Sequence, residues 1–174
     1  MVFTSFKGSP VQTAGMLPVA GQEAPPFSLT RVDLSEATLE TYAGKVKILS
    51  FVPSLDTSVC ALSARRFNEA VVSMSGVVLL NISADLPFAQ KRFCQSEKLS
   101  AVEPLSSFRA PGFGKAYGVL IQDGPLTGLL ARAVLVVDRA NRVVYSQGVS
   151  EITNEPDYFS ALASAQAALF APVS

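Results

Sequence analysis

The sequence predicts an α/β domain with a central mixed β-sheet flanked by helices and with an N-terminal β-hairpin. Two patterns carry this prediction. Apolar runs of strand length alternate with amphipathic segments of helix length, and the last two apolar runs are joined by only a short turn. The chain has 174 residues, of which 49% are apolar and 16% are charged. We therefore expect one folded domain over residues 1–174.

The first elements are the hairpin and a buried strand. Residues 2–14 alternate weakly around a Gly-Ser-Pro turn, as hairpins do. A proline-rich loop over residues 20–30 leads into a short extended piece, and residues 37–44 are typical of a short helix closed by glycine. The continuous apolar run over residues 46–52 has the length of a central strand.

The next elements are a helix, a strand and a second helix. Residues 61–74 are helical in pattern, with Leu62, Phe67, Ala70 and Val71 expected near one face. Residues 76–83 predict another buried strand. Residues 85–97 then predict a helix, with Asp85 as its N-cap and Pro87 in its first turn.

The last elements are a hairpin and a C-terminal helix. Residues 111–119 are rich in glycine and predict a short helix or loop. Residues 131–149 contain two strands joined by a turn at 138–141, which predicts an antiparallel hairpin. In the helix expected over 154–170, Asn154 and Asp157 have the spacing of a capping box. The predicted apolar stripe of that helix contains Phe159, Leu162, Ala163, Gln166, Leu169 and Phe170.

Composition excludes several classes of function. Lys and Arg together number 14, as do Asp and Glu, so we expect no nucleic acid and no anionic membrane as the main partner. No run of 18 apolar residues is present, and residues 1–18 lack a basic head followed by an apolar stretch. We therefore expect a reducing, cytoplasmic location, where cysteines more often serve chemistry than act as static crosslinks.

The sequence contains two cysteines and no histidine. A Ser-His-Asp triad, a Cys-His pair and a Cys/His zinc site are therefore excluded. Any chemistry at a cysteine must be activated by a group other than imidazole.

Cys60 lies where a cysteine is readily activated. Pro53 ends the preceding strand, because proline cannot donate to a β-ladder. Ser54, Asp56 and Thr57 are helix-capping residues, so the helix begins within this stretch and Cys60 falls in its first turn. Unpaired backbone N–H groups and the helix dipole favour a thiolate there. The carboxyl end of a central strand is also a common ligand site.

The helix terminus alone is insufficient to activate the thiol. A free cysteine has a pKa of about 8.5, and lowering it to ~6 needs roughly 3.4 kcal/mol. A helix terminus supplies ~0.3–1 kcal/mol, or up to ~2 kcal/mol when partly buried. We therefore expect a nearby cation. Arg132 is preferred, because it opens an apolar run and needs a partner there, whereas Arg65 and Arg66 are expected on the solvated side of their helix.

These residues taken alone leave a structural interpretation open. A lone cysteine such as Cys60 is often a small buried hydrophobe. Thr57 is also explained as a helix cap, and Arg132 as part of a structural ion pair. Cys94 reads as the buried side of a helix.

The stretch "PSLDTSVC" resembles the Pro-x-x-x-Thr-x-x-Cys signature of the peroxiredoxins. The stretches "SADLPFAQKRFC" and "EITNEPDY" are similar to those of the thiol peroxidase group (Tpx), the bacterial atypical two-cysteine branch of that family. The similarity extends over nearly the whole chain, and the three stretches together are highly specific for this group.

This resemblance implies a thioredoxin-like fold, a homodimer and reduction by thioredoxin. It implies that Cys60 is the peroxidatic cysteine and Cys94 the resolving cysteine, joined in an intramolecular disulfide during turnover. Thr57 and Arg132 would complete the hydroperoxide site, with Pro53 shielding it. The implied mechanism uses no metal and no organic cofactor.

Two other functions are considered. The chain could be a peroxide-sensing relay that passes a disulfide to a partner protein, or a non-catalytic domain with a structural Cys60–Cys94 bridge. The apolar residues Phe51, Leu55 and Val59 leave room for alkyl hydroperoxides as well as hydrogen peroxide. We also expect the two sulfurs to be too far apart to bond in the reduced form, so that disulfide formation needs local unwinding.

Overall fold

A mixed sheet of seven strands forms the centre of the molecule in the computed structural model, which describes residues 3–172. Residues 1–2 and 173–174 of the predicted domain lie outside this range. The sheet has the order β11-β10-β6-β7-β8-β4-β5, where the strands are β4 (Leu29–Thr30), β5 (Glu36–Ala37), β6 (Val46–Phe51), β7 (Val77–Ser83), β8 (Val102–Ser106), β10 (Ala133–Val137) and β11 (Val143–Gly148). Strands β6, β7 and β8 are parallel, and the other pairings are antiparallel.

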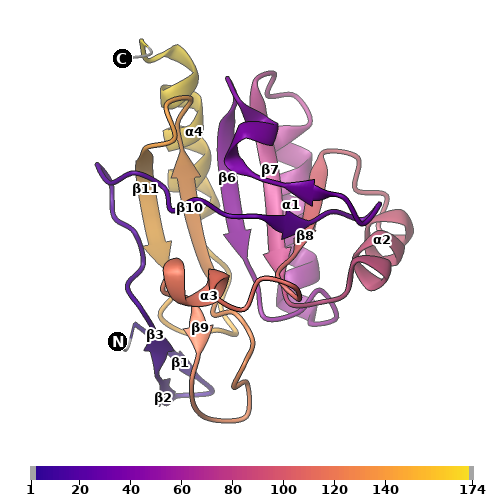
Figure 1. Ribbon diagram of the computed structural model, residues 1–174, viewed down its shortest axis with the longest axis vertical. Coiled ribbons are helices and arrows are strands. Elements are labelled where there is room, and N and C mark those ends of the chain that lie inside the picture. The colour runs from indigo at the N-terminus through magenta and orange to yellow at the C-terminus, as the bar shows by residue number, and fades with distance from the viewer. Residues whose placement is uncertain (1–2, 173–174) are drawn as a thin grey trace.

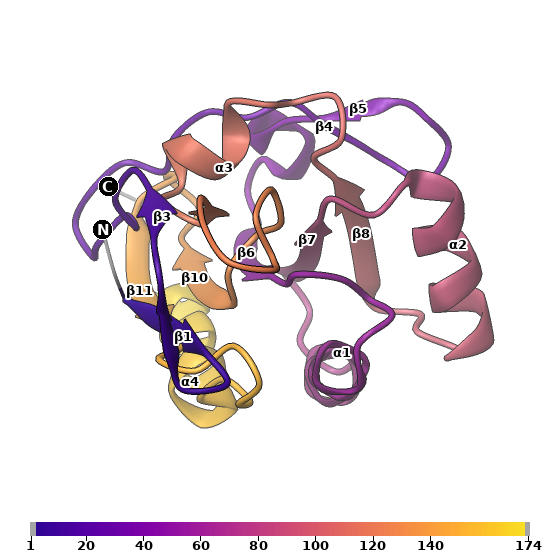
Figure 2. The same ribbon diagram turned by 90° about the horizontal axis from the view of Figure 1, so that it is seen from below.

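Helices cover both faces of this sheet (Figures 1 and 2). Helices α1 (Ser58–Val71) and α4 (Tyr158–Phe170) lie on one face, where Phe67 packs with the apolar side chains of β6 and β10. The short helix α3 (Phe113–Ala116) and the 3-10 helix η1 (Leu39–Tyr42) lie on the opposite face, over a second apolar cluster. The predicted α/β architecture is therefore confirmed.

Helix α2 (Pro87–Ser96) lies beside α1 at the edge of the molecule and packs against β8 (Figure 2). It follows the carboxyl end of β7, just as α1 follows the carboxyl end of β6. The starts of α1 and α2 therefore meet at one edge of the parallel strands, where ligand sites of α/β sheets commonly form.

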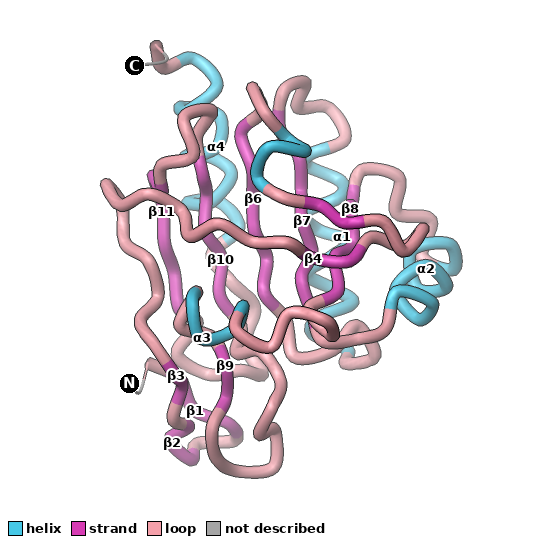
Figure 3. The backbone as a smooth tube through the Cα atoms, viewed as in Figure 1, coloured by secondary structure: helices cyan, strands magenta, loops and turns pink. Residues whose placement is uncertain are grey.

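The N-terminal hairpin is formed by β1 (Thr4–Phe6) and β2 (Ser9–Val11), as predicted, but the predicted Gly-Ser-Pro turn is wrong, because Ser9 and Pro10 already pair within β2. Its turn has φ values of 51° at Lys7 and 82° at Gly8, which suits a two-residue hairpin of the primed type. Next along the chain, β3 (Thr13–Ala14) pairs with β9 (Leu120–Ile121) outside the main sheet (Figure 3).

The hairpin is fastened to the segment that follows β11. The backbone N–H of Ser5 donates to Ser150, and the backbone N–H of Ile152 donates to Ser5, both at 2.9 Å. The Glu151 carboxylate accepts from the backbone N–H of Gly8 and of Lys7 and from the Ser5 hydroxyl. These hydrogen bonds hold the pKa of Glu151 at about 2.

Two details of the predicted helices are wrong. In α4, Phe159 and Phe170 are each 81% exposed, and the sheet is faced by Ala161, Ala165 and Ala168 instead. Small side chains let the helix backbone approach the sheet closely, so bulk was a misleading guide to the buried face. Helix α4 is capped by Asp157, whose side chain accepts from the Ser160 N–H, and not by the predicted box beginning at residue 154.

Other differences concern α1 and β8. The buried face of α1 contains Phe67 and Val71 as predicted, but Leu62 and Ala70 are only half-buried, and Cys60 and Ala64 lie on that face instead. Strand β8 was not predicted, because its sequence VEPLS contains a carboxylate and a proline and lacks an apolar run. In the part of the chain that the structure describes, no helix has both the length and the apolar composition needed to cross a membrane.

Candidate active site

Cys60 lies in the first turn of α1 and is completely buried. Pro53 follows the end of β6, and Thr57 is the N-cap of the helix, with extended backbone angles of −97° and 146°. The Thr57 Oγ1 atom accepts a hydrogen bond from the Cys60 N–H at 3.4 Å. The loop sequence thus places the sulfur near the positive end of the helix dipole.

Arg132, which directly precedes β10, is brought to Cys60 from 72 residues further along the chain. It is 2% exposed, and its Nη2 atom donates to the Cys60 Sγ atom at 3.1 Å. Its Nε atom donates to the backbone carbonyl of Ile152 at 2.8 Å, which fixes the plane of the guanidinium. The nearby cation expected from the sequence is therefore present.

The charge of Arg132 has no carboxylate partner among the described residues. A buried guanidinium is costly without an anion, and Cys60 as a thiolate supplies one. The Arg132 Nη1 atom is buried and has no hydrogen-bond partner among residues 3–172. It therefore remains free to donate to a bound substrate.

The two arginines of α1 are engaged elsewhere. Arg65 Nη1 lies 2.8 Å from Glu97 Oε2, and Arg66 Nε lies 3.4 Å from Glu155 Oε1. Both side chains are also substantially exposed, as the sequence predicted. Neither arginine is available as the partner of Cys60.

A cavity of about 200 Å³ is lined by Arg132, the hydrogen-bond partner of Cys60. Thr57 and Arg132 are among its polar lining residues, and Pro53 forms part of its wall. The remaining wall is mostly apolar and includes Phe6, Leu126, Leu129 and Ile152. No sequence pattern indicates that Phe6 belongs to the site, because it comes from the N-terminal hairpin.

The Thr57 hydroxyl already donates its hydrogen to the backbone carbonyl of Ser54, at 3.1 Å. Its oxygen can therefore act toward a ligand as an acceptor. Arg132 can only donate. A ligand between them must offer a hydrogen to Thr57 and a lone pair to Arg132, which an O–O–H group does.

Cys94 lies in α2 and is half-buried, and both cysteines are free thiols in the structure. Burial raises the pKa of Cys94 to about 11, so it stays protonated at neutral pH. The neighbouring Phe93 side chain packs against Val52, Leu55 and Cys60. Cys94 thus belongs to the helix that contributes a ring to the surroundings of Cys60.

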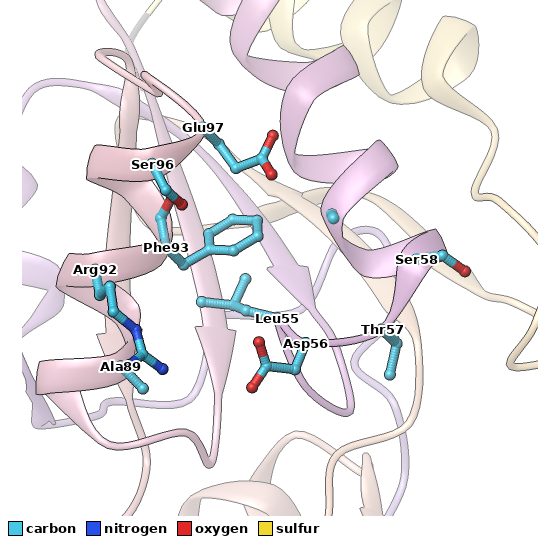
Figure 4. Close-up of a pocket in the computed structure, with 10 residues that line it drawn as sticks. Leu55, Asp56, Thr57, Ser58, Ala89, Arg92, Phe93, Ser96 and Glu97 are labelled. Atoms are coloured by element: carbon cyan, nitrogen blue, oxygen red, sulfur yellow. The ribbon is translucent and has the colours of Figure 1, made fainter.

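A pocket of about 410 Å³ lies between the start of α1 and α2 (Figure 4). Phe93 points from α2 toward Leu55, and Arg92 and Asp56 reach toward the same space from opposite sides. The sulfur–sulfur separation predicted from the sequence stays a prediction.

Asp85 is not the N-cap of α2, contrary to the sequence prediction. The N-cap is Leu86, which has no capping side chain. The Asp85 carboxylate instead accepts from the Ser54 hydroxyl at 2.9 Å, the Leu55 N–H at 2.8 Å and the Ser83 hydroxyl at 2.7 Å. The Asp85 carboxylate therefore binds donors of the loop before α1 instead of the N–H groups at the start of α2.

The chain matches the Redoxin family over residues 19–162. The chain belongs to the Redoxin family. Among its relatives, a thiol peroxidase of Leptospira interrogans (strain Fiocruz L1-130) is 52% identical over 171 residues, covering 97% of this chain and 100% of that protein. A thiol peroxidase of Corynebacterium glutamicum is 45% identical over 163 residues, covering 94% and 98% respectively.

A solved structure supports the same assignment of this Redoxin-family chain. The peroxiredoxin-like protein from Aquifex aeolicus is 40% identical and superposes with a TM-score of 0.89, covering 94% of this chain and 95% of that one. These relatives place the chain in the thiol peroxidase group of the peroxiredoxins, with the thioredoxin-like fold. In residues 3–172, no group of three His, Cys, Asp or Glu side chains could hold a metal ion.

Proposed function

We propose that this protein is a thiol-dependent peroxidase that reduces hydroperoxides at Cys60. The observation that carries the proposal is the buried contact between the Arg132 Nη2 atom and the Cys60 Sγ atom, at 3.1 Å. It supplies the activating cation that the chemistry of a thiolate needs in a protein without histidine. The thiol peroxidases among the relatives support the same activity.

In the first step, the Cys60 thiolate attacks the terminal oxygen of the hydroperoxide, and the O–O bond breaks. Cys60 becomes a sulfenic acid, and the released alkoxide takes a proton to leave as an alcohol, or as water when the substrate is hydrogen peroxide. The Thr57 oxygen holds the peroxide by accepting a hydrogen bond from its O–H group. The free Arg132 Nη1 donates to the oxygen on which charge develops, in the manner of an oxyanion hole.

In the second step, the Cys94 thiol condenses with the Cys60 sulfenic acid. An S–S bond forms, and one molecule of water leaves. A dithiol protein of the thioredoxin type then reopens the disulfide by exchange and is itself oxidised. The high pKa of Cys94 suits this role, because a protonated thiol does not compete with Cys60 for peroxide.

The shape of the cavity bears on the substrate. Its wall beyond Thr57 and Arg132 is formed mostly by apolar side chains, including Phe6, Leu126 and Leu129. Burying an alkyl group against such a wall is favourable. We therefore include alkyl hydroperoxides as well as hydrogen peroxide among the substrates.

The proposal also includes the setting of the enzyme. One continuous seven-stranded sheet supports a single domain over residues 1–174, and the resemblance to the thiol peroxidase group supports a homodimer. A dithiol reductant implies a reducing compartment, which the cytoplasm provides. Light scattering on the purified protein tests the homodimer, with a monomer mass as the contradicting result.

A peroxide-sensing relay is not favoured, because the relatives of the chain are thiol peroxidases. The alternative of a structural Cys60–Cys94 bridge is also disfavoured, since both residues are free thiols and Cys60 contacts a buried arginine.

Two variants test the proposal with hydrogen peroxide and thioredoxin as reductant. Cys60→Ser should abolish peroxide reduction, whereas Cys94→Ser should complete one rapid turnover and then stall. Since the chain contains no tryptophan, rapid quenching followed by mass spectrometry is a suitable readout. Fast peroxide consumption by Cys60→Ser, or unimpaired cycling by Cys94→Ser, would contradict the assigned roles.

A further inference from the structure

The Asp85 carboxylate joins the two segments that carry the cysteines. It accepts from the hydroxyl of Ser54 and the N–H of Leu55, which belong to the loop leading into α1. Asp85 itself lies between the end of β7 and the start of α2. A single side chain thus ties the loop before Cys60 to the base of the helix that carries Cys94.

The Asp85 end of this connection is anchored to the sheet. Its carboxylate also accepts from the Ser83 hydroxyl at 2.7 Å, and its backbone carbonyl accepts from the Ser106 hydroxyl at 2.5 Å. Ser83 is held in turn by the buried side chain of Gln90, which donates at 3.1 Å. Asp85 is therefore fixed, and the loop residues are the part that can leave.

The loop end of the connection leads directly to Cys60. Ser54, held by Asp85, accepts with its backbone carbonyl from the hydroxyl of Thr57 at 3.1 Å. Thr57 in turn caps the first turn of α1 and accepts from the Cys60 N–H. If this loop moves away, the Asp85 carboxylate loses two of the three hydrogen bonds that it accepts, and the capped turn loses its support.

We propose that Asp85 is a positioning residue that acts as a latch: it holds the Cys60 loop closed and sets how long the sulfenic acid waits before Cys94 reaches it. This inference rests on the proposed function and deepens it. The latch does not touch the substrate. It favours the closed form by the hydrogen bonds that exist only there.

The waiting time decides between two products. If the latch opens, Cys94 and the Cys60 sulfenic acid form the disulfide and release water. If it stays closed and a second hydroperoxide arrives, the sulfenic acid is oxidised to sulfinic acid and the hydroperoxide is reduced to an alcohol or water. Asp85 therefore sets the sensitivity of the enzyme to excess peroxide.

The test is Asp85→Asn, which keeps the shape of the side chain and removes its charge. Hydrogen bonds to a charged acceptor are the stronger ones, so the open form should gain about tenfold in population, equivalent to about 1.4 kcal/mol. Disulfide formation should accelerate about tenfold by the same argument, and the sulfinic fraction at high peroxide should fall. The rate of the first step should stay nearly unchanged, because the closed form still predominates. Rapid quenching and mass spectrometry separate these products.

Two further variants complete the experiment. Ser54→Ala removes one donor to the Asp85 carboxylate. It should also accelerate disulfide formation and lower the sulfinic fraction, each by less than Asp85→Asn does. This variant keeps the test decisive if Asp85→Asn fails to fold. Asp138→Asn is the matched control: its carboxylate accepts from the N–H groups of Ala140 and Arg142 in the β10–β11 turn, and it should leave the disulfide rate unchanged.

The latch is refuted if neither Asp85→Asn nor Ser54→Ala accelerates disulfide formation, or if the Asp138→Asn control does so equally. Failure of the proposed function has a different mark, which is that the unmodified protein shows no rapid oxidation of Cys60 by peroxide. The two ideas therefore fail separately.

Discussion

Replacing Arg132 by methionine should impair the enzyme in two separable ways. The guanidinium donates to the Cys60 sulfur in a fully buried contact, and its buried Nη1 atom has no hydrogen-bond partner among residues 3–172 and can donate to a substrate. Methionine fills a similar volume and can do neither. We expect the variant to lose thiolate at neutral pH and also to react more slowly with peroxide through the thiolate that remains.

The magnitudes follow from these two contacts. A hydrogen bond to a charged group contributes ~1.5–3 kcal/mol, which corresponds to a roughly 10- to 150-fold weaker preference for the thiolate over the thiol. Removing a donor from a developing negative charge costs about 10²- to 10³-fold in rate. At neutral pH the two losses multiply.

Two assays separate these losses. Alkylation by iodoacetamide across a range of pH measures the thiolate alone, because that reaction needs no donor to an oxygen. Peroxide reduction at high pH, where Cys60 is fully ionised in both proteins, isolates the second loss. Arg65→Met is the matched control, since Arg65 is paired with Glu97 and should leave both rates near those of the unmodified protein.

Two results would refute this reasoning. Unchanged alkylation of Arg132→Met would show that another group stabilises the thiolate. Full recovery of the peroxide rate at high pH would show that Arg132 contributes no donor to the substrate.

Three further outcomes are expected. Phe6→Ala should slow reduction of a bulky alkyl hydroperoxide by roughly tenfold, because about 1.5 kcal/mol of apolar contact is lost. The rate with hydrogen peroxide should stay unchanged. If both rates fall equally, Phe6 does not contact the alkyl group of the substrate. Hydrogen bonding lowers the pKa of Glu151 to about 2, so its stabilisation is present above the ordinary value of 4.5 and lost as pH falls toward 2. The unfolding temperature of Glu151→Gln should therefore fall less than that of the unmodified protein as pH is lowered from 4.5 toward 2. Parallel plots of unfolding temperature against pH for the two proteins would contradict this prediction. Oxidation to the disulfide should speed amide hydrogen exchange over residues 56–64 and 88–97 but not over 77–82, and identical exchange in both redox forms would exclude local unwinding.

The sequence anticipated the features that depend on neighbouring residues. The capped start of α1 follows from Pro53 and Thr57, and the hairpin from its glycine turn, because local geometry decides both. Arg132 could be predicted for another reason. A charge at the start of a buried strand needs a partner, and the Cys60 thiolate needs a cation. Its partner Cys60 lies 72 residues away, and the structure brings the two into contact.

Other features were out of reach because tertiary packing decides them. Phe6 enters the cavity only because the hairpin docks near Glu151, which no spacing in the sequence reveals. Asp85 has the pattern of a helix cap, and only the folded structure shows that donors of a distant loop compete for it. In α4, the apolar size of Phe159 was outweighed by the close approach that alanines allow.

The split of the active site between α1 and β10 also has a consequence for biosynthesis. Strand β10 pairs with the central strand β6, although β7 and β8 are made first. At about 5–20 residues per second, the ribosome needs roughly 4–14 s to add the 72 residues that separate Cys60 from Arg132. Throughout that interval the nascent chain carries an ordinary thiol without its guanidinium partner. Chains truncated before Arg132 are therefore expected to react with peroxide only as slowly as a free cysteine, so that reactivity begins with closure of the sheet.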